Sequence, residues 1–317
     1  MANADQLKAL IKTHYDGDFE KFTTISLQVA AHEAHLGHSM LANDIRNIVD
    51  KSKITKLRLK PFNQNLEGLI LKVEPFERLS DLIVSDVISE RIERIINEYI
   101  QVEKLRRHNL ENRRKILLSG PPGTGKTMTA SIIANELELP LYVILMDKMV
   151  TKFMGETSAK LRQVFDAIEE KQGVYLFDEF DAIGTNRSKD NDVGEMRRVL
   201  NSFLQFIEHD NSDSLIIAAT NNLGLLDEAL FRRFDDVLHY QLPSDTEKFL
   251  LLENRLGNYA GKFDLNSIVD KLDNLSHAEI SKACSDAIKE SVLNDKAKVE
   301  KSLLIKMIND KKAAYQQ

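Results

Sequence analysis

A short run of small and basic residues, GPPGTGKT at positions 120 to 127, has the composition of a phosphate-binding loop. It follows an apolar run, KILLS, and precedes a helical pattern, MTASIIANEL. Glycine permits backbone angles at which successive N–H groups turn toward one anion, and the following helix directs its positive N-terminal end at the same place. The Lys126 ammonium can contact the β- and γ-phosphates, and the Thr127 hydroxyl can ligate Mg²⁺.

This spacing satisfies the P-loop pattern, including the strand before it and the helix after it. The alternative is an ordinary turn rich in glycine and proline. The ligand expected at a P-loop is a nucleoside triphosphate with a magnesium ion. The predicted binding residues are Gly120, Pro121, Pro122, Gly123, Thr124, Gly125, Lys126 and Thr127.

Two carboxylates, Asp178 and Glu179, follow the apolar run VYLF. Four apolar residues in succession suit a strand that is buried on both faces, and ligands of open α/β sheets bind at the carboxyl ends of such strands. Asp178 is therefore predicted to hold Mg²⁺ through water, and Glu179 to polarise the attacking water. General-base catalysis of this kind contributes roughly 10²- to 10⁴-fold. A strand ending in Asp-Glu is weak evidence alone and strong evidence after a P-loop.

Further candidate residues follow two later apolar runs. Asn221, at the end of IIAATNN, could orient the water against the γ-phosphate, although a helix cap or turn residue is the alternative. Arg232 and Arg233 are adjacent, and adjacent arginines are usually just solvated. A guanidinium supplied by a neighbouring subunit can nevertheless accelerate phosphoryl transfer by about 10³–10⁵. If these arginines reach a neighbour's site, the active enzyme is an oligomer.

Alternating apolar runs and helical patterns surround these residues and predict an α/β fold with a five-stranded parallel sheet and helices on both faces. After Pro243 the patterns are helical only, which predicts a C-terminal helical lid. Three helical patterns near the N-terminus predict a small bundle, and the basic segment that follows is interpreted as a linker. The expected strands cover 115–119, 141–145, 174–177, 214–219 and 237–241; the expected domains are 1–52, 53–75 (linker), 76–242 and 243–317.

Composition excludes several other classes of protein. The net charge of −6 over 317 residues argues against a duplex-DNA binder, which needs a strongly basic face. A single cysteine, Cys284, cannot form a disulfide framework or a cysteine metal cluster within one chain. The chain has no apolar run near the ~20 residues that span a membrane, and its N-terminus lacks the pattern of a signal peptide. A cytoplasmic location is expected.

Four motifs in this order, GPPGTGKT, LFDEFDAIG, AATNN and LDEALFRRFDD, resemble those of the AAA ATPases over about residues 76 to 317. The resemblance implies ATP and Mg²⁺ as cofactors, a hexameric ring, Walker B residues at Asp178 and Glu179, and sensor 1 at Asn221. It also implies arginine fingers at Arg232 and Arg233, whose adjacent spacing is similar to the spastin and katanin group. Residues 79–84, LSDLIV, correspond to the adenine-binding backbone. In LSHAEISKAC, His277 replaces a family glycine and Ala278 is implied to face adenine.

The same resemblance suggests a role for TKFMGET, residues 151–157. AAA ATPases place an aromatic–hydrophobic pair here, on a loop facing the central pore, and Lys152, Phe153 and Met154 match it. A rigid aromatic offers a large contact area and methionine adapts to varied partners, so the pair suits a polypeptide substrate. The alternative is a hydrophobic cap on the following helix. Residues 186–198 correspond to a second pore loop, or equally to a solvated loop.

The leading hypothesis is an ATP-driven protein remodeller, and the alternatives are a nucleic-acid-linked ATPase and a nucleotide-gated scaffold. The sequence is also similar to bacterial AAA proteins found beside subtilisin-like serine proteases in antiphage operons, which implies a separate protease partner. His32 and His35 could share a metal ion, whereas His38 follows a glycine and is expected past the helix end; histidines on a polar helix face are the simpler interpretation. The basic linker could touch nucleic acid or be merely solvated.

Overall fold

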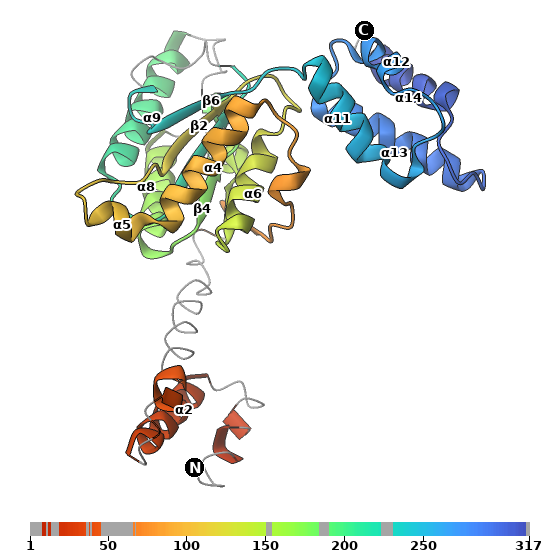
Figure 1. The fold of residues 1–317 in the computed structure, drawn as a ribbon. Helices are drawn as coiled ribbons and strands as arrows, with labels where there is room; N and C mark the ends of the chain where they lie inside the picture. The colour runs from red at the N-terminus through yellow and green to blue at the C-terminus, as the bar shows by residue number, and fades with distance from the viewer. Residues whose placement is uncertain are drawn as a thin grey trace. The chain divides into compact units, whose positions relative to one another are not determined.

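The computed structural model describes residues 8–10, 12–13, 19–35, 38, 40–45, 66, 68–149, 154–183, 190–222 and 231–314. The chain divides into two compact units, residues 1–61 and 62–317, which Figure 1 colours from red to blue along the sequence. Each unit is described by itself below.

The first unit contains helix α2 (Phe19–His35) and further helical residues at 8–10, 12–13 and 40–45. Helix α2 buries Val29 and Ala30. It also buries Glu33, whose carboxylate Oε2 lies 2.7 Å from Nδ1 of His38. A cluster of three side chains suited to a metal ion is not found among the described residues. The structure therefore pairs His38 with a carboxylate.

The second unit is built on a six-stranded sheet with the order β1-β3-β4-β5-β2-β6. The five predicted strands are all present and parallel to one another. The prediction was wrong about a sixth, β1, which pairs antiparallel with β3 and lies in the segment interpreted as a linker. The strands are β1 (Ile70–Val73), β2 (Lys115–Ser119), β3 (Leu141–Ile144), β4 (Val174–Phe177), β5 (Leu215–Thr220) and β6 (Asp236–His239).

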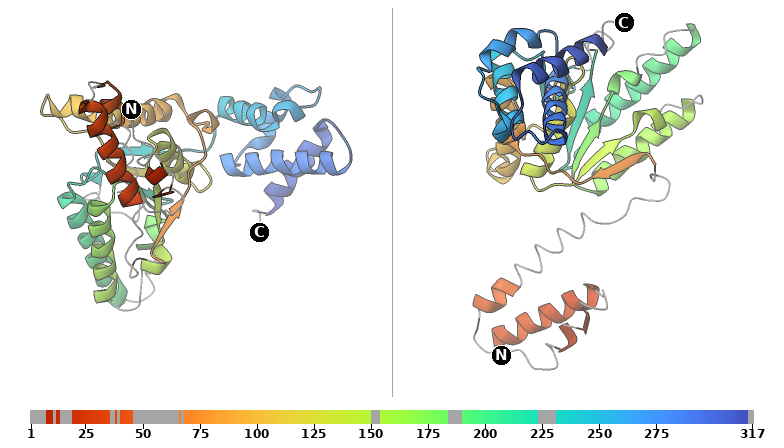
Figure 2. Two further views of the ribbon diagram at one scale, coloured as in Figure 1. Left: turned by 90° about the horizontal axis from the view of Figure 1, so that it is seen from below. Right: turned by 90° about the vertical axis from the view of Figure 1, so that its right-hand side faces the viewer.

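Helices cover both faces of this sheet (Figures 1 and 2). Helices α4 and α6 pack on one face through Ile92, Ile95 and Ile133, and α8 and α9 pack on the other through Val164 and Phe203. Every residue of β4 and β5 is buried, which explains why both strands appear in the sequence as unbroken apolar runs. These helices and the shorter ones near them are η2 (Leu79–Asp81), α4 (Asp86–Ile100), α5 (Val102–Arg106), α6 (Lys126–Glu136), α7 (Met146–Met149), α8 (Met154–Glu170), η3 (Phe180–Ile183) and α9 (Asp190–His209).

The predicted second pore loop needs a correction. Residues 190–198 are helical and form the first part of α9, whereas 186–189 lie outside the described residues. Helix α9 carries apolar residues at helical spacing, and Phe203 and Ile207 in its later turns are fully buried against the sheet. That packing extends the helix through residues that were assigned to a loop.

The C-terminal segment is helical, as predicted. Capping boxes at Ser244 with Glu247 and at Ser276 with Glu279 fix where two of its helices begin. Its core contains Leu252, Ile280 and Cys284, and burial raises the pKa of the Cys284 thiol to about 12. The helices are α11 (Asp245–Leu256), η5 (Gly257–Tyr259), α12 (Asn266–Val269), η6 (Asp270–Leu272), α13 (His277–Leu293) and α14 (Lys301–Ala314).

A membrane-spanning helix is not found in the described part of the chain, where each helix is too short or too polar.

Four phenylalanines pack between the sheet and helices α8 and α9. The Phe203 ring lies 5.7 Å from Phe165, 5.2 Å from Phe177 and 4.5 Å from Phe180, measured between ring centroids. Phe180 directly follows Asp178, which was predicted to hold Mg²⁺, and Glu179, which was predicted to be catalytic. The cluster therefore supports the backbone that carries them.

We expect Phe203→Ala to lower the free energy of unfolding by about 3–5 kcal/mol, because it leaves a cavity in this cluster. Denaturant unfolding followed by circular dichroism measures the change. Val87→Ala is the matched control, since Val87 is 65% exposed, and its effect should stay within about 0.5 kcal/mol. Equal stability of the two variants would contradict the packing role of Phe203.

Candidate nucleotide-binding site

The order of the strands brings the predicted motifs to one edge of the sheet. The P-loop follows β2, Asn221 follows β5, and Asp178 with Glu179 follows β4. Strand β5 lies between β2 and β4 and is parallel to both, so all three carboxyl ends meet at the same edge. This is the edge where open α/β sheets bind their ligands.

The backbone of the P-loop is closely packed, which explains its glycines. Gly120 and Gly123 have φ angles of +144° and +74°. A Cβ atom at Gly120 would lie 2.2 Å from the carbonyl oxygen of Tyr240, and one at Gly123 would lie 2.6 Å from Oγ of Ser276. A side chain at either position would displace backbone or the lid, so the loop forms only with glycine there.

Lys126 is the first residue of α6, and its ammonium is held inside the loop. The Nζ atom donates to the carbonyl oxygens of Gly120 and Pro121, both at 2.8 Å. Burial lowers the pKa of Lys126, while the carboxylates of Asp178 and Asp181 oppose that shift. The ammonium is thus placed where a phosphate oxygen can replace a loop carbonyl as its acceptor.

Thr127 and Asp178 form an oxygen pair suited to magnesium. The Thr127 hydroxyl donates to Oδ2 of Asp178 at 2.7 Å. Hydroxyl and carboxylate oxygens are the hard ligands that Mg²⁺ prefers, so these residues fit the ion.

Glu179 has an unusual backbone conformation beside this pair. Its N–H donates to Oδ1 of Asp178 at 2.9 Å, and its φ angle is +51°. Positive φ is uncommon outside glycine, and strained residues of this kind concentrate at functional sites. The conformation supports a dedicated role for Glu179.

Asp181 was not identified from the sequence as a site residue. Its Oδ1 accepts hydrogen bonds from the Thr220 hydroxyl at 3.2 Å and from the Asn221 backbone N–H at 3.1 Å. It thereby joins the segment after β4 to the end of β5 and holds the backbone of Asn221 in place. The available signal was its position in the same acidic motif, DEFD, as Asp178.

Residues 122–127 of the P-loop, with Asp178, Glu179 and Asn221, line a cleft of about 610 Å³, which lies within the range of about 300–1,000 Å³ for small-molecule sites. The predicted Gly120 and Pro121, and Asp181, are not among the described residues that line it. The lid closes one side, because the Ala278 N–H donates to the Gly123 carbonyl at 2.9 Å. Both nitrogens of the buried His277 ring lack a hydrogen-bond partner, and burial lowers the pKa of that ring. Lining residues that were not predicted from the sequence are Met128, Leu251, Arg255 and Ser281. The predicted 79–84 segment contributes Asp81, Leu82 and Ile83.

The predicted arginines do not line the cleft. Arg232 and Arg233 are exposed and are not among the described residues that line the cleft. The Nη2 atom of Arg233 instead lies 3.1 Å from Oε2 of Glu208. Lys152 and Phe153 lie outside the described residues, and Met154 is the first residue of α8. The cleft therefore unites the P-loop, acidic and Asn221 predictions without the arginines.

Comparison with known proteins shows the family of this chain. The sequence profile of the ATPase family associated with various cellular activities (AAA) matches residues 116–242. An AAA family ATPase of Sinorhizobium fredii is 30% identical over 307 residues, which cover 95% of this chain and 92% of that protein. The chain belongs to the AAA family of ATPases. As an AAA ATPase, it binds and hydrolyses ATP.

Two proteasome-activating nucleotidases are also similar to this AAA ATPase. One, from Haloferax volcanii, is 35% identical over 181 residues, which cover 54% of this chain and 44% of that protein. Another, from Methanopyrus kandleri, is 33% identical over 220 residues, which cover 66% of this chain and 49% of that protein. The similarity therefore spans about half the length of these two relatives.

We expect Glu179→Gln to bind ATP normally and to hydrolyse it about 10²- to 10⁴-fold more slowly, because the amide cannot accept a proton from water. Fluorescent-nucleotide binding and phosphate release measure the two effects separately. Glu169→Gln, an exposed substitution on α8, is the control and should leave turnover unchanged. Rapid turnover by Glu179→Gln would remove Glu179 from this role.

Proposed function

We propose that this AAA ATPase is a protein remodeller that works as a hexameric ring and engages a polypeptide in its pore. The observation that carries the proposal is the separation of Arg232 and Arg233 from the chain's own cleft. Arg255 lines the chain's own cleft, whereas Arg232 and Arg233 do not, so we infer that these two act in the cleft of a neighbouring subunit.

The chemistry within one cleft follows from its geometry. Lys126 and the loop N–H groups bind the phosphates, and Asn221 orients water. Glu179 accepts the proton of that water. Thr127 and Asp178 would hold Mg²⁺, whose charge would offset that of the phosphates.

The relatives support protein as the substrate, since their names describe nucleotidases that activate proteasomes. We infer that Lys152, Phe153 and Met154 form the substrate-gripping pore loop, which ends at the first residue of α8. Residues 1–52 then act as the adaptor that selects the substrate. The same inference includes a separate serine protease in bacterial antiviral defence as a partner, and a cytoplasmic location.

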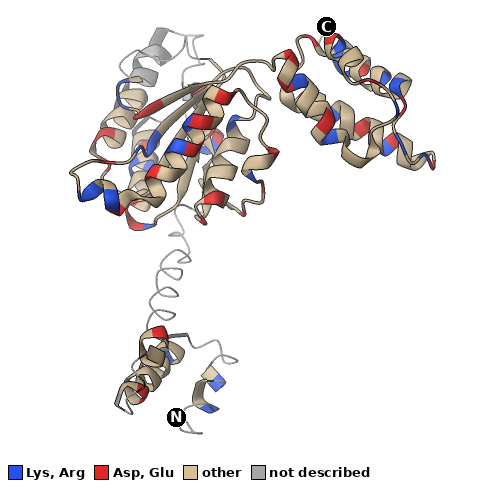
Figure 3. Cartoon of the chain, viewed as in Figure 1, with Lys and Arg blue, Asp and Glu red and all other residues tan. Residues whose placement is uncertain are grey.

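Charge favours this proposal over a nucleic-acid-linked ATPase. Figure 3 shows acidic and basic residues interspersed along the helices of the described lid. A nucleic-acid groove requires a continuous basic surface, and the net charge of the chain is −6.

We expect Arg233→Ala to lose about 10³-fold or more in turnover while it binds ATP, because the neighbour's phosphates lose a guanidinium. Mixing it with Glu179→Gln subunits should restore turnover. The first variant then keeps an intact cleft and the second supplies an intact arginine. Phosphate release is measured for each variant and for the mixture. Normal hydrolysis by Arg233→Ala would contradict catalysis across an interface.

We expect an unfolded protein to stimulate hydrolysis by the natural chain and not by Phe153→Ala, because the alanine loses the contact area that grips the polypeptide. Turnover is compared with unfolded protein, with DNA and with neither. Tyr259→Ala, which removes a 41% exposed ring from the lid, is the control and should still be stimulated. If DNA stimulates hydrolysis and Phe153→Ala does not change that stimulation, the nucleic-acid alternative is favoured.

A further inference from the structure

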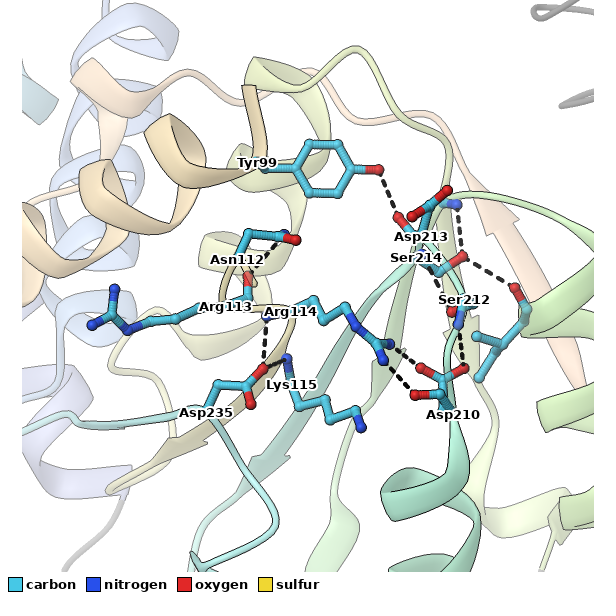
Figure 4. A network of polar contacts seen from close by, with 12 residues as sticks. Tyr99, Asn112, Arg113, Arg114, Lys115, Asp210, Ser212, Asp213, Ser214 and Asp235 are labelled. Carbon is cyan, nitrogen blue, oxygen red and sulfur yellow. Dashed lines mark hydrogen bonds and ion pairs between the residues drawn. The ribbon is translucent and has the colours of Figure 1, made fainter. Parts of the chain in front are cut away.

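A network of polar contacts fixes the segment that directly follows the two arginines (Figure 4). One carboxylate oxygen of Asp235, Oδ2, accepts the backbone N–H groups of Arg114 and Lys115, each at 2.9 Å. The Asp235 N–H donates to the Lys115 carbonyl at 2.8 Å. Three hydrogen bonds therefore hold this residue to the start of β2.

An ion pair between Arg114 and Asp210 supports the start of β2, which Asp235 contacts. The Arg114 guanidinium contacts both the carboxylate and the backbone carbonyl of Asp210 (Figure 4). The Asp210 side chain is 1% exposed and that of Arg114 is 15% exposed. The Arg114 carbonyl also accepts the N–H of Ile216 at 2.7 Å, which ties it to β5. Arg114 is thus locked through its backbone and its side chain.

Arg233 is held from two sides by this arrangement. Phe234, between Arg233 and Asp235, is buried in the core at 7% exposure. Arg233 pairs with Glu208, which is two residues before Asp210 on the same chain segment. Both the backbone after the arginines and the end of helix α9 are therefore fixed to Arg114.

We propose that Asp235, supported by the Arg114–Asp210 pair, is a positioning residue for Arg233. This inference rests on the proposed action of that arginine in a neighbouring cleft. A guanidinium that stabilises a transferring phosphoryl group must be held close to one geometry, because a displacement of 1 Å can cost about 10²-fold in rate. Arg233 is exposed, and its surface pair with Glu208 does not by itself supply that precision.

The same contacts relate the arginines to the chain's own P-loop. Strand β6 begins one residue after Asp235 and pairs with β2 from Ile116 to Ser119. Beyond it, the Tyr240 N–H donates to the Ser119 carbonyl at 2.6 Å, and its carbonyl packs against Gly120. The segment that contains the arginines is thus joined through β6 to β2, the strand that leads into this subunit's phosphate loop.

The test is a double-mutant cycle in the full-length chain. We expect Asp235→Ala to reduce kcat about tenfold or more while KM changes less than twofold, since its own cleft is intact. Asp235→Asn, which keeps an acceptor oxygen, should lose less. The double variant Arg233→Ala/Asp235→Ala should be no slower than Arg233→Ala alone, because Asp235 acts through the arginine. Mixing Asp235→Ala with Glu179→Gln subunits should restore turnover.

Asp213→Ala is the matched control, because Asp213 belongs to the neighbouring exposed pair with Arg106 and should leave kcat unchanged. The positioning role would be overturned if the rate losses of the two single variants multiplied in the double variant. It would also be overturned by a normal kcat for Asp235→Ala, or if mixing with Glu179→Gln subunits did not restore turnover. A slow Arg233→Ala with a normal Asp235→Ala would overturn this inference alone. Normal hydrolysis by Arg233→Ala would overturn the proposed function, and this inference with it.

Discussion

The close packing of the P-loop between two other segments is the constraint on which the rest of this structure depends. On one side the Tyr240 carbonyl leaves no space for a Cβ atom at Gly120, and on the other Ser276 leaves none at Gly123. The first contact joins the loop to the end of β6 and the second joins it to the start of α13. The loop that binds phosphate is therefore also the place where the sheet and the lid touch.

The parallel sheet turns this local packing into a catalytic arrangement. Because β5 separates β2 from β4, Asn221, which follows β5, falls between the phosphate loop and the acidic pair. Asp181 then fixes the backbone of Asn221 across the gap. At the other side of β2, strand β6 carries the arginine-bearing segment. Strand β2 thus has β5, which leads to Asn221, on one side and β6, which follows the two arginines, on the other. We propose that those arginines act in a neighbouring cleft.

Much of this fold could be predicted because its determinants are local in sequence. The five parallel strands are unbroken apolar runs, and the P-loop has a distinctive spacing. Strand β1 was missed because it lies at the sheet edge with Leu71 52% exposed, so it has no buried run. The helical residues 190–198 were assigned to a loop because their polar composition conceals packing that occurs later in α9. Arg255 and Ser281 line the cleft from positions distant in sequence, which no local pattern reveals, whereas Asp181 lies in the same acidic motif as Asp178.

The buried cysteine of the lid has a consequence for the chemistry this chain undergoes. Cys284 is the only cysteine, and a pKa of about 12 leaves roughly one thiol in 10⁵ ionised at pH 7. Oxidants and disulfide exchange act on the thiolate, and this one is enclosed by apolar side chains. The thiol of Cys284 is therefore a poor target for oxidants and for disulfide exchange.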